Sequence, residues 1–362
     1  FRARIVPEIG VRPRPAYPAP VSLSYPCGDP PPAGQTTEVA PGVLWLRMPL
    51  PFELRWINLW LLADGEGWMV VDTGVATDET RTHWDTILAS GALGGRPVTR
   101  VLVTHMHPDH VGLAGWLAGR FGCPLLMSRL EYVVCRMLLA DTGREAPEEG
   151  VDFYRAAGWD EAALATYRRR FGLFGRLVGP MPNSFRRVSA GDTLEIDGRR
   201  WQVLGGNGHS PEHVCLWCPE LNVFISGDQL LPRISSNVSV FPTEPEADPL
   251  TDWLESCARL QRQLPADVLV LPAHNEPFTG AHERLQELID GHELCLTRLE
   301  RRLAKGPQRA VDVFGALFPT AVTSAVLGFA TGEAIAHLHC LMARGRAVRR
   351  PGPDGAWWYS LP

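Results

Sequence analysis

The chain has 362 residues, of which 45% are hydrophobic and 21% charged, and its formal net charge is -5 at pH 7. This balance is that of an ordinary folded protein, and it excludes a disordered or fibrous chain. The slightly acidic charge gives no overall attraction to nucleic acid. Because the length exceeds that of one typical domain, we expect a large domain and a smaller one.

Eight cysteines are spread thinly along the chain, and a chain of this length needs no disulfides, so we interpret them as reduced thiols. No run of about 18 to 20 apolar residues predicts a membrane-spanning helix. The first residues also lack the basic and apolar regions of a secretory signal. The expected location is therefore the cytoplasm. Since residue 1 is Phe1 and not Met, a targeting segment upstream would be invisible in this sequence.

The N-terminal part divides into a proline-rich arm and a series of alternating elements. Prolines throughout residues 1–40 prevent regular helix and predict an extended arm over the main body, with disorder as the alternative. Beyond the arm, apolar runs bounded by turn residues alternate with helical spacing, which indicates a layered fold of strands and helices. We predict strands at 43–48, 58–62, 68–71 and 98–103, and helices at 78–90 and 112–121.

Four potential metal ligands follow the apolar strand that ends at Val103. They are His105, His107, Asp109 and His110. Imidazole nitrogen and carboxylate oxygen are ligands that suit zinc. Four such side chains within six residues are costly to pack unless something coordinates them. A solvated loop, or core histidines bonded to the backbone, is the plainer alternative, but the motif favours a metal site whose remaining ligands lie elsewhere.

Three later strands are each followed by a residue that could bind a metal. Residues that follow strand ends are held by a rigid sheet, as an active site requires. From the pattern alone, the two histidines of the glycine-rich loop are nearly equal candidates. The residues are His209 and His213 after the strand at 200–204, Asp228 after the strand at 222–225, and His274 after the strand at 268–271.

Residues 129–182 interrupt the alternation with helical segments at 130–139 and 148–170 that carry many aromatic residues. Such an insertion beside a metal loop could form a lid or a substrate wall. An insertion that packs on the core, or on a second subunit in a homodimer, fits the pattern equally well.

Together these residues resemble the metallo-β-lactamase superfamily over about residues 40–280, and the turn Asp72-Thr73-Gly74 fits the same pattern. The resemblance implies an α+β fold, a four-layer αββα sandwich with a dinuclear metal site at one edge. His110 and the Gly-Asp aspartate Asp228 make the chain more similar to glyoxalase II-type hydrolases than to lactam-cleaving enzymes. We therefore assign residues 41–280 to a catalytic domain that contains the insertion.

The resemblance also implies a role for each ligand. Two zinc ions per chain are expected, although His/Asp ligation accepts manganese or iron as well. Relatives that reduce oxygen at a di-iron centre replace the second histidine of the motif by glutamate, so His107 disfavours redox chemistry. His105, His107 and His209 would hold one ion, Asp109, His110 and His274 the other, and Asp228 would bridge them, with Asp72 and His213 behind the ligands.

The expected activity is hydrolysis. Two ions that share a water can lower its pKa towards about 7, so the expected nucleophile is a metal-bridging hydroxide held at Asp109 and Asp228. A thioester or a related ester or lactone suits this arrangement, as in hydroxyacylglutathione hydrolases. Paired metals also suit phosphodiesters, so a nuclease is one alternative, and a non-catalytic metal-binding sensor is another. No motif marks a glutathione, CoA or lactone pocket, so no substrate-binding residue is predicted.

Residues 281–362 change to helical sequence followed by a small hairpin, which resembles the winged-helix-like C-terminal module of some β-lactamase-like hydrolases. They hold ten Lys/Arg against eight Asp/Glu, and the helix that would enter a DNA groove, at 332–344, has Arg344 as its single basic residue. Base readout is therefore poorly supported, and nucleic acid is not an expected partner. We expect this domain to be structural or dimerising, or to form a wall over the active site.

Overall fold

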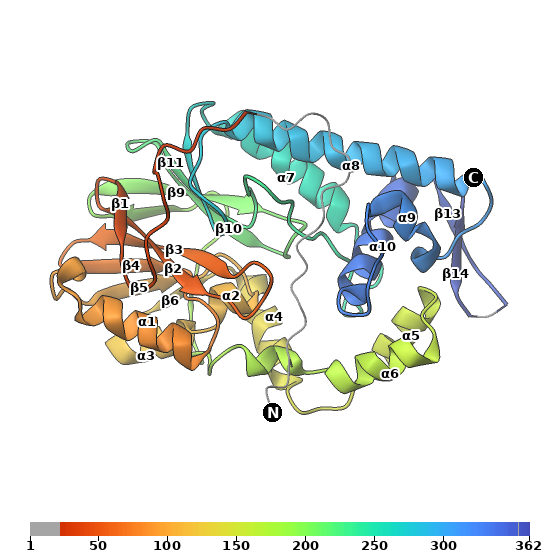
Figure 1. Cartoon of the computed structure of the whole chain (residues 1–362), viewed down its shortest axis with the longest axis horizontal. Coiled ribbons are helices and arrows are strands. Elements are labelled where there is room, and N and C mark those ends of the chain that lie inside the picture. Colours follow the sequence, from red (N-terminus) through yellow and green to blue (C-terminus); the bar gives the residue numbers. More distant parts are fainter. Residues whose placement is uncertain (1–21, 354) are drawn as a thin grey trace.

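Two β-sheets packed face to face between helices form the larger lobe of the computed structural model, which describes residues 22–353 and 355–362 (Figure 1). Residues 1–21 of the proline-rich arm lie outside the described part. From residue 22 the chain runs along the body, where Ser24 forms a β-bridge with Thr279. It then enters the first sheet at β1 (Thr37–Ala40).

The first sheet has seven strands in chain order, β1 to β7. Neighbours from β1 to β4 are antiparallel, and those from β4 to β7 are parallel. The strands predicted in this region all belong to this sheet. Its further strands are β2 (Val43–Pro49), β3 (Trp56–Asp64), β4 (Gly67–Val71), β5 (Val98–Leu102), β6 (Leu125–Met127) and β7 (Arg186–Arg187).

The second sheet has the strand order β12-β11-β10-β9-β8. All its neighbours are antiparallel except β11 and β12, which are parallel. The parallel pair matters for function, because its two carboxyl ends lie at the same edge. The strands are β8 (Thr193–Ile196), β9 (Arg199–Gly206), β10 (His213–Cys218), β11 (Val223–Gly227) and β12 (Leu269–Pro272).

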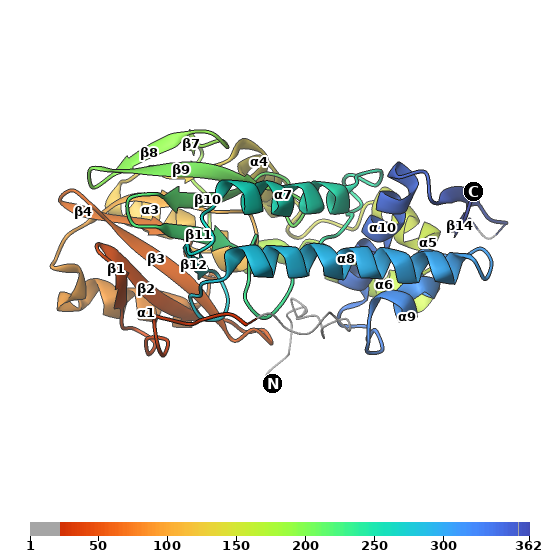
Figure 2. The same cartoon turned by 90° about the horizontal axis from the view of Figure 1, so that it is seen from above.

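Apolar side chains on both faces of each sheet produce four layers. Trp60 of the first sheet and Trp201 of the second belong to one buried cluster between the sheets. On the outer face of the first sheet, Trp84 of α1 (Asp78–Ala89) packs in a second cluster together with α3 (Ala114–Phe121). On the outer face of the second, α7 (Pro249–Gln263) and α8 (Ala281–Leu303) run side by side (Figure 2). The predicted αββα sandwich is confirmed, although α7 was not among the predicted helices.

The predicted insertion contains α4 (Arg129–Ala140), which packs on the first sheet's cluster, and two further helices. The single helical stretch predicted at 148–170 is wrong, since the chain forms α5 (Glu148–Ala156) and α6 (Glu161–Arg170). They are separated at Gly158, whose φ of 103° is left-handed. Asp160 then caps α6 by accepting a hydrogen bond from the Ala163 N–H.

The C-terminal residues form a second lobe, against which α5 and α6 lie (Figure 1). The Val311 N–H donates to the Ala157 carbonyl at 3.2 Å, and the Trp159 indole N–H donates to Thr331 Oγ1 at 2.9 Å. The lobe contains the end of α8, then α9 (Phe314–Leu317), α10 (Leu327–Ala343) and the hairpin of β13 (Val348–Pro351) and β14 (Trp357–Ser360).

Within the described residues, no helix combines the length and apolar character needed to cross a membrane.

Candidate metal centre

The candidate ligands meet where strands of both sheets end at one edge of the sandwich. His105 follows β5 of the first sheet, and the short helix α2 (Pro108–Val111) follows it directly. Pro108 occupies the first position of that helix, where its missing N–H costs nothing. Asp228 and His274 follow the parallel strands β11 and β12 of the second sheet. The two sheets thus supply opposite sides of a single site.

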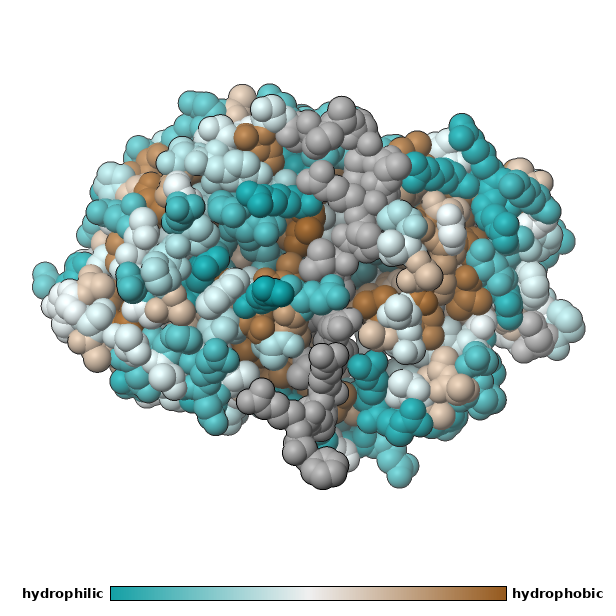
Figure 3. Space-filling view, in the orientation of Figure 1, coloured by the Kyte–Doolittle hydropathy of each residue, from teal (hydrophilic) through white to brown (hydrophobic). Residues whose placement is uncertain are grey.

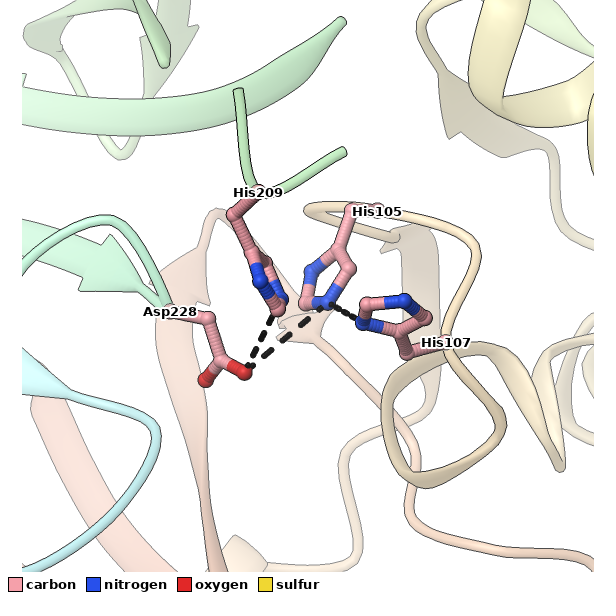
Figure 4. Close-up of side chains that lie close together, drawn as sticks. All are labelled: His105, His107, His209 and Asp228. Atoms are coloured by element: carbon pink, nitrogen blue, oxygen red, sulfur yellow. Dashed lines mark hydrogen bonds and ion pairs between the residues drawn. The ribbon is translucent and has the colours of Figure 1, made fainter. Parts of the chain in front are cut away.

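The first group of potential ligands consists of His105, His107, His209 and Asp228, whose ligand atoms all lie within 4.8 Å of one another. Figure 4 shows the three imidazoles and the carboxylate turned towards one another. His209 Nε2 lies 3.3 Å from Asp228 Oδ2, and His105 Nε2 lies 4.0 Å from the same oxygen. His105 Nε2 and His107 Nδ1 are 2.8 Å apart.

The second group consists of Asp109, His110 and His274. His274 Nε2 lies 3.4 Å from Asp109 Oδ2, and His110 Nε2 lies 3.8 Å from it. Both of these nitrogens are also 3.5 Å from Asp228 Oδ1. Asp228 therefore presents one carboxylate oxygen to each group, as a bridging ligand would. The structure brings together the residues of each predicted ligand set, while their binding of metal stays a prediction.

The atoms that face the centre suit metal ions. His110 Nε2, His209 Nε2, His274 Nε2 and Asp228 Oδ1 are buried and have no hydrogen-bond partner among the described residues. Such atoms are costly to bury unless something binds them. A tetrahedral zinc ion with bonds of about 2.0–2.2 Å holds its ligand atoms about 3.3–3.6 Å apart, close to most of the separations around Asp228. The residues present therefore fit the two ions that the sequence predicts.

Hydrogen bonds at Nδ1, the ring nitrogen that points away from the centre, orient three of the imidazoles. Nδ1 of His209 lies 2.7 Å from the Asn237 carbonyl oxygen, and Nδ1 of His274 lies 3.0 Å from that of Trp56. Since a carbonyl can only accept, each Nδ1 carries the proton and each Nε2 is left to bind a metal. Nδ1 of His110 donates in the same way to Asp72 Oδ2 at 2.8 Å.

Asp72 lies behind the candidate ligands, where it contacts His110 and Thr104. Its carboxylate accepts hydrogen bonds from the Thr104 N–H and the Thr104 hydroxyl, each at 2.8 Å, in addition to that from His110. Its φ of 62° is left-handed, a conformation that aspartate tolerates better than most residues. The turn therefore ties the end of β4 to the residue that precedes His105.

His213 is buried beside the first group but belongs to neither group of potential ligands. Its Nε2 accepts a hydrogen bond from the Asp228 N–H at 3.2 Å. Its ring stacks on that of His105, with the ring centroids 4.8 Å apart. The geometry therefore distinguishes His209 from His213, which the sequence pattern alone did not. Of the two, only His209 directs its Nε2 at the Asp228 carboxylate.

Burial and neighbouring charges shift the pKa values of the histidines in opposite directions. Burial, reinforced by neighbouring histidines, lowers the pKa of His105 well below its usual value, and burial together with His209 lowers the pKa of His107 to about 3. Burial also opposes the charged form of His110 and His274. For His110, however, Asp72, Asp109 and Asp228 outweigh burial, and for His274, Asp228 and Asp109 outweigh it, so the pKa of each is raised.

Glu131 of α4 is a site residue that the sequence did not reveal. Its side chain is fully buried, and burial raises its pKa. One oxygen accepts from the Met106 N–H at 2.9 Å and the other from the Glu212 N–H at 2.8 Å. Glu131 thus ties the loop of His105 and His107 to that of His209. The one signal in the sequence is an acidic residue on the buried face of α4, which also carries Tyr132 and Cys135.

Fold and site together define a metal-dependent hydrolase, and comparison with known proteins gives the family. Residues 56–274 match the model of the metallo-beta-lactamase superfamily. Residues 296–362 match that of the metallo-beta-lactamase-like C-terminal domain. The chain belongs to the metallo-β-lactamase superfamily.

Two solved structures resemble nearly the whole chain. A beta-lactamase domain protein from Burkholderia ambifaria is 41% identical, with a TM-score of 0.83 over 94% of this chain and 99% of that one. A metallo-beta-lactamase family protein from Thermus thermophilus is 30% identical, with a TM-score of 0.74 over 90% of this chain and all of that one. Both lobes therefore recur together in other members of the superfamily.

Curated relatives are more distant. The probable metallo-hydrolase YqjP of Bacillus subtilis is 26% identical over 83% of this chain and 92% of its own length. A hydroxyacylglutathione hydrolase of Rhizobium meliloti is 29% identical over 41% of this chain and 62% of its own length. An atrochrysone carboxyl ACP thioesterase of Aspergillus fumigatus is 24% identical over 58% of this chain and 36% of its own length.

Proposed function

We propose that the chain is a dinuclear zinc hydrolase that cleaves a thioester or a related ester or lactone. The observation that carries the proposal is the convergence of buried, unpartnered ligand atoms on the two oxygens of Asp228. In this arrangement, His105, His107 and His209 would hold one ion, Asp109, His110 and His274 the other, and Asp228 would bridge them. When bound, paired ions of this kind supply an activated water and stabilise the oxyanion that forms on a carbonyl.

The chain's own residues prepare the site for such ions. The neutral imidazoles of His105 and His107 are in the protonation state that metal binding requires. The Nδ1 hydrogen bonds of His110, His209 and His274 fix their rings before an ion arrives. This preorganisation supports a catalytic centre more than a loose storage site.

An apolar stripe on α4 supports an acyl substrate. Leu130, Val133 and Met137 are spaced three and four residues apart, so they share one helix face, and each is exposed. The stripe begins beside the metal loops, because the Leu130 N–H donates to Glu212 Oε2 at 2.9 Å. Apolar surface also gathers where the two lobes meet (Figure 3). The names of the distant relatives point the same way, since two of them are thioester hydrolases.

The test is a parallel assay of the zinc-loaded protein. We expect turnover of acyl-glutathione or acyl-CoA thioesters or of lactones, and none of single-stranded RNA. His105→Ala should abolish the turnover, whereas His83→Ala on the remote helix α1 should preserve it. Cleavage of RNA without turnover of any ester would replace this proposal by a nuclease. Loss of metal from His105→Ala with full activity retained would refute the mechanism.

A further inference from the structure

A loop of the larger lobe carries the carbonyl that orients His209. Residues 229–240 follow β11 and Asp228 and pass beneath the His209 side chain. The Asn237 carbonyl accepts the hydrogen bond from His209 Nδ1 at 2.7 Å, which directs Nε2 towards Asp228. The position of this one carbonyl therefore decides where the ligand nitrogen of His209 lies.

The same loop is bound by α10 of the C-terminal lobe. The Asn237 side-chain amide donates to Glu333 Oε2 at 3.0 Å. The Ser239 hydroxyl bonds to Asn237 Oδ1 at 2.5 Å, and the Val240 N–H donates to the Gly332 carbonyl at 3.0 Å. These contacts hold both the side chain and the backbone of the loop against the helix.

Gly332 makes this close approach possible. A Cβ at this position would lie 2.7 Å from Ser239 Cβ and 2.8 Å from the Val240 carbonyl oxygen, distances that real Cβ atoms essentially never show. The helix therefore carries a glycine where the loop crosses it. Next to it stands Glu333, a carboxylate that is only 1% exposed on a helix whose other buried residues are mostly apolar. A buried carboxylate is costly unless it is bonded, and here it binds the loop that orients His209.

We propose that Glu333 and Asn237 are positioning residues through which the C-terminal lobe holds His209 in place for its metal ion. The path runs from Glu333 on α10 to the Asn237 side chain, and from the Asn237 carbonyl to the His209 ring. The C-terminal lobe then contributes to the geometry of the metal centre as well as to the stability of the fold. The inference rests on the proposed metal centre, but it does not depend on which ester is the substrate.

Zinc affinity is the direct readout. Removing a partner that orients a metal-binding histidine typically weakens metal binding by about 10–100-fold. Because Glu333 acts through Asn237, we expect Glu333→Ala and Asn237→Ala each to lower the affinity for one of the two zinc ions by about tenfold. Competition with a chromophoric chelator measures this affinity. Both should also change the visible spectrum of the cobalt-substituted protein. Glu333→Gln keeps an oxygen that can accept from Asn237, so it should restore native affinity and spectrum.

Thr331→Val is the matched control. It removes the two hydrogen bonds of the Thr331 hydroxyl on α10, one accepted from the Trp159 indole N–H and one donated to the Leu327 carbonyl, at nearly constant volume. It should bind both ions as the unaltered chain does. Native zinc affinity in folded Glu333→Ala and Asn237→Ala would overturn the inference, as would an equal loss in Thr331→Val. If Glu333→Ala fails to fold, Asn237→Ala alone decides. Absence of activity on every ester tested would count against the proposed substrates and leave the metal readout intact.

Discussion

The side chains of the centre differ in which of their polar atoms have hydrogen-bond partners. In the described part of the chain, Nε2 of His110, His209 and His274 has no hydrogen-bond partner, whereas Nδ1 of the same rings is bonded. This asymmetry distinguishes a ligand from an ordinary buried histidine, which would have both nitrogens satisfied. The supporting residue Glu131 has the opposite character, because main-chain donors bind both of its oxygens.

Replacing Glu131 by glutamine tests its bracing role. Glutamine keeps only one acceptor oxygen, so either the Met106 N–H or the Glu212 N–H loses its hydrogen-bond acceptor while it stays inside the protein. We expect Glu131→Gln to lower the free energy of unfolding of the metal-free protein by roughly 1–3 kcal/mol in urea denaturation. The same change at the exposed Glu145 should have little effect. Equal stability of the two variants would show that the brace is dispensable.

The two groups of ligands should take up metal with different pH dependence. The raised pKa values of His110 and His274 mean that, without a metal ion, each holds a proton up to a higher pH than an ordinary histidine does. An ion that enters their group must displace those protons, so its affinity should rise as the pH rises above about 6.5. His105 and His107, whose pKa values are lowered, have no proton to lose.

Calorimetric titration with zinc in two buffers of different ionisation enthalpy measures this difference. One binding event should release more protons than the other, and the ion that releases more should bind more weakly as the pH falls. Equal proton release at both positions would contradict the assignment of charge.

At the scale of elements, the centre depends on strand ends and on tight contacts between segments. Helix α3 follows the ligand motif and contains two glycines with different surroundings. A Cβ at Gly115 would collide with the main-chain carbonyl of Pro180, whereas a Cβ at Gly119 would meet no atom of residues 22–353 or 355–362 within 4 Å. The first glycine is therefore needed for close packing, and the second only weakens the helix.

Alanine at the two positions should have opposite effects. Gly115→Ala must push α3 away from the segment at Pro180, and we expect a loss of roughly 1–3 kcal/mol in the free energy of unfolding. Gly119→Ala should stabilise by roughly 0.5–1 kcal/mol, because alanine favours a helix over glycine. Urea denaturation of both variants provides the comparison. Destabilisation by Gly119→Ala would mean that its side of α3 is covered by something.

On the scale of the whole molecule, two sheets and two lobes converge on one site. Asp72 and His105 come from the first sheet, and Asp228 and His274 from the second. Metal ions at their junction would therefore link the halves of the sandwich. Such ions bind only the folded arrangement, so they stabilise it by mass action.

Chelation should thus lower the melting temperature. Each ion present at 100 times its dissociation constant adds about 2.7 kcal/mol to the free energy of unfolding. We expect a clear downward shift in a thermal melt after dialysis against a chelator, and recovery when zinc is restored. An unchanged melt, with metal loss verified by elemental analysis, would show that the folded centre does not need ions.

The sequence by itself predicted the alternating strands and the candidate ligands that follow strand ends, and its resemblance to one family implied the αββα class. It could do so because these signals are local: apolar runs end in His105, Asp228 or His274, and the chain order of such runs is typical of one family. It also predicted one helix at 148–170, which the left-handed Gly158 divides into two, and it made no prediction for α7, although Asp248 and Pro249 begin that helix with ordinary start signals.

Only the tertiary structure decided how the ligands are supported. His209 lies on the loop after β9 and His213 begins β10, and their positions differ because the Asp228 carboxylate faces His209 while the Asp228 N–H faces His213. Glu131 and Glu333 each lie on helices remote in sequence from the loops that they bind. Their contacts depend on how whole layers and lobes pack, so no local pattern announces them.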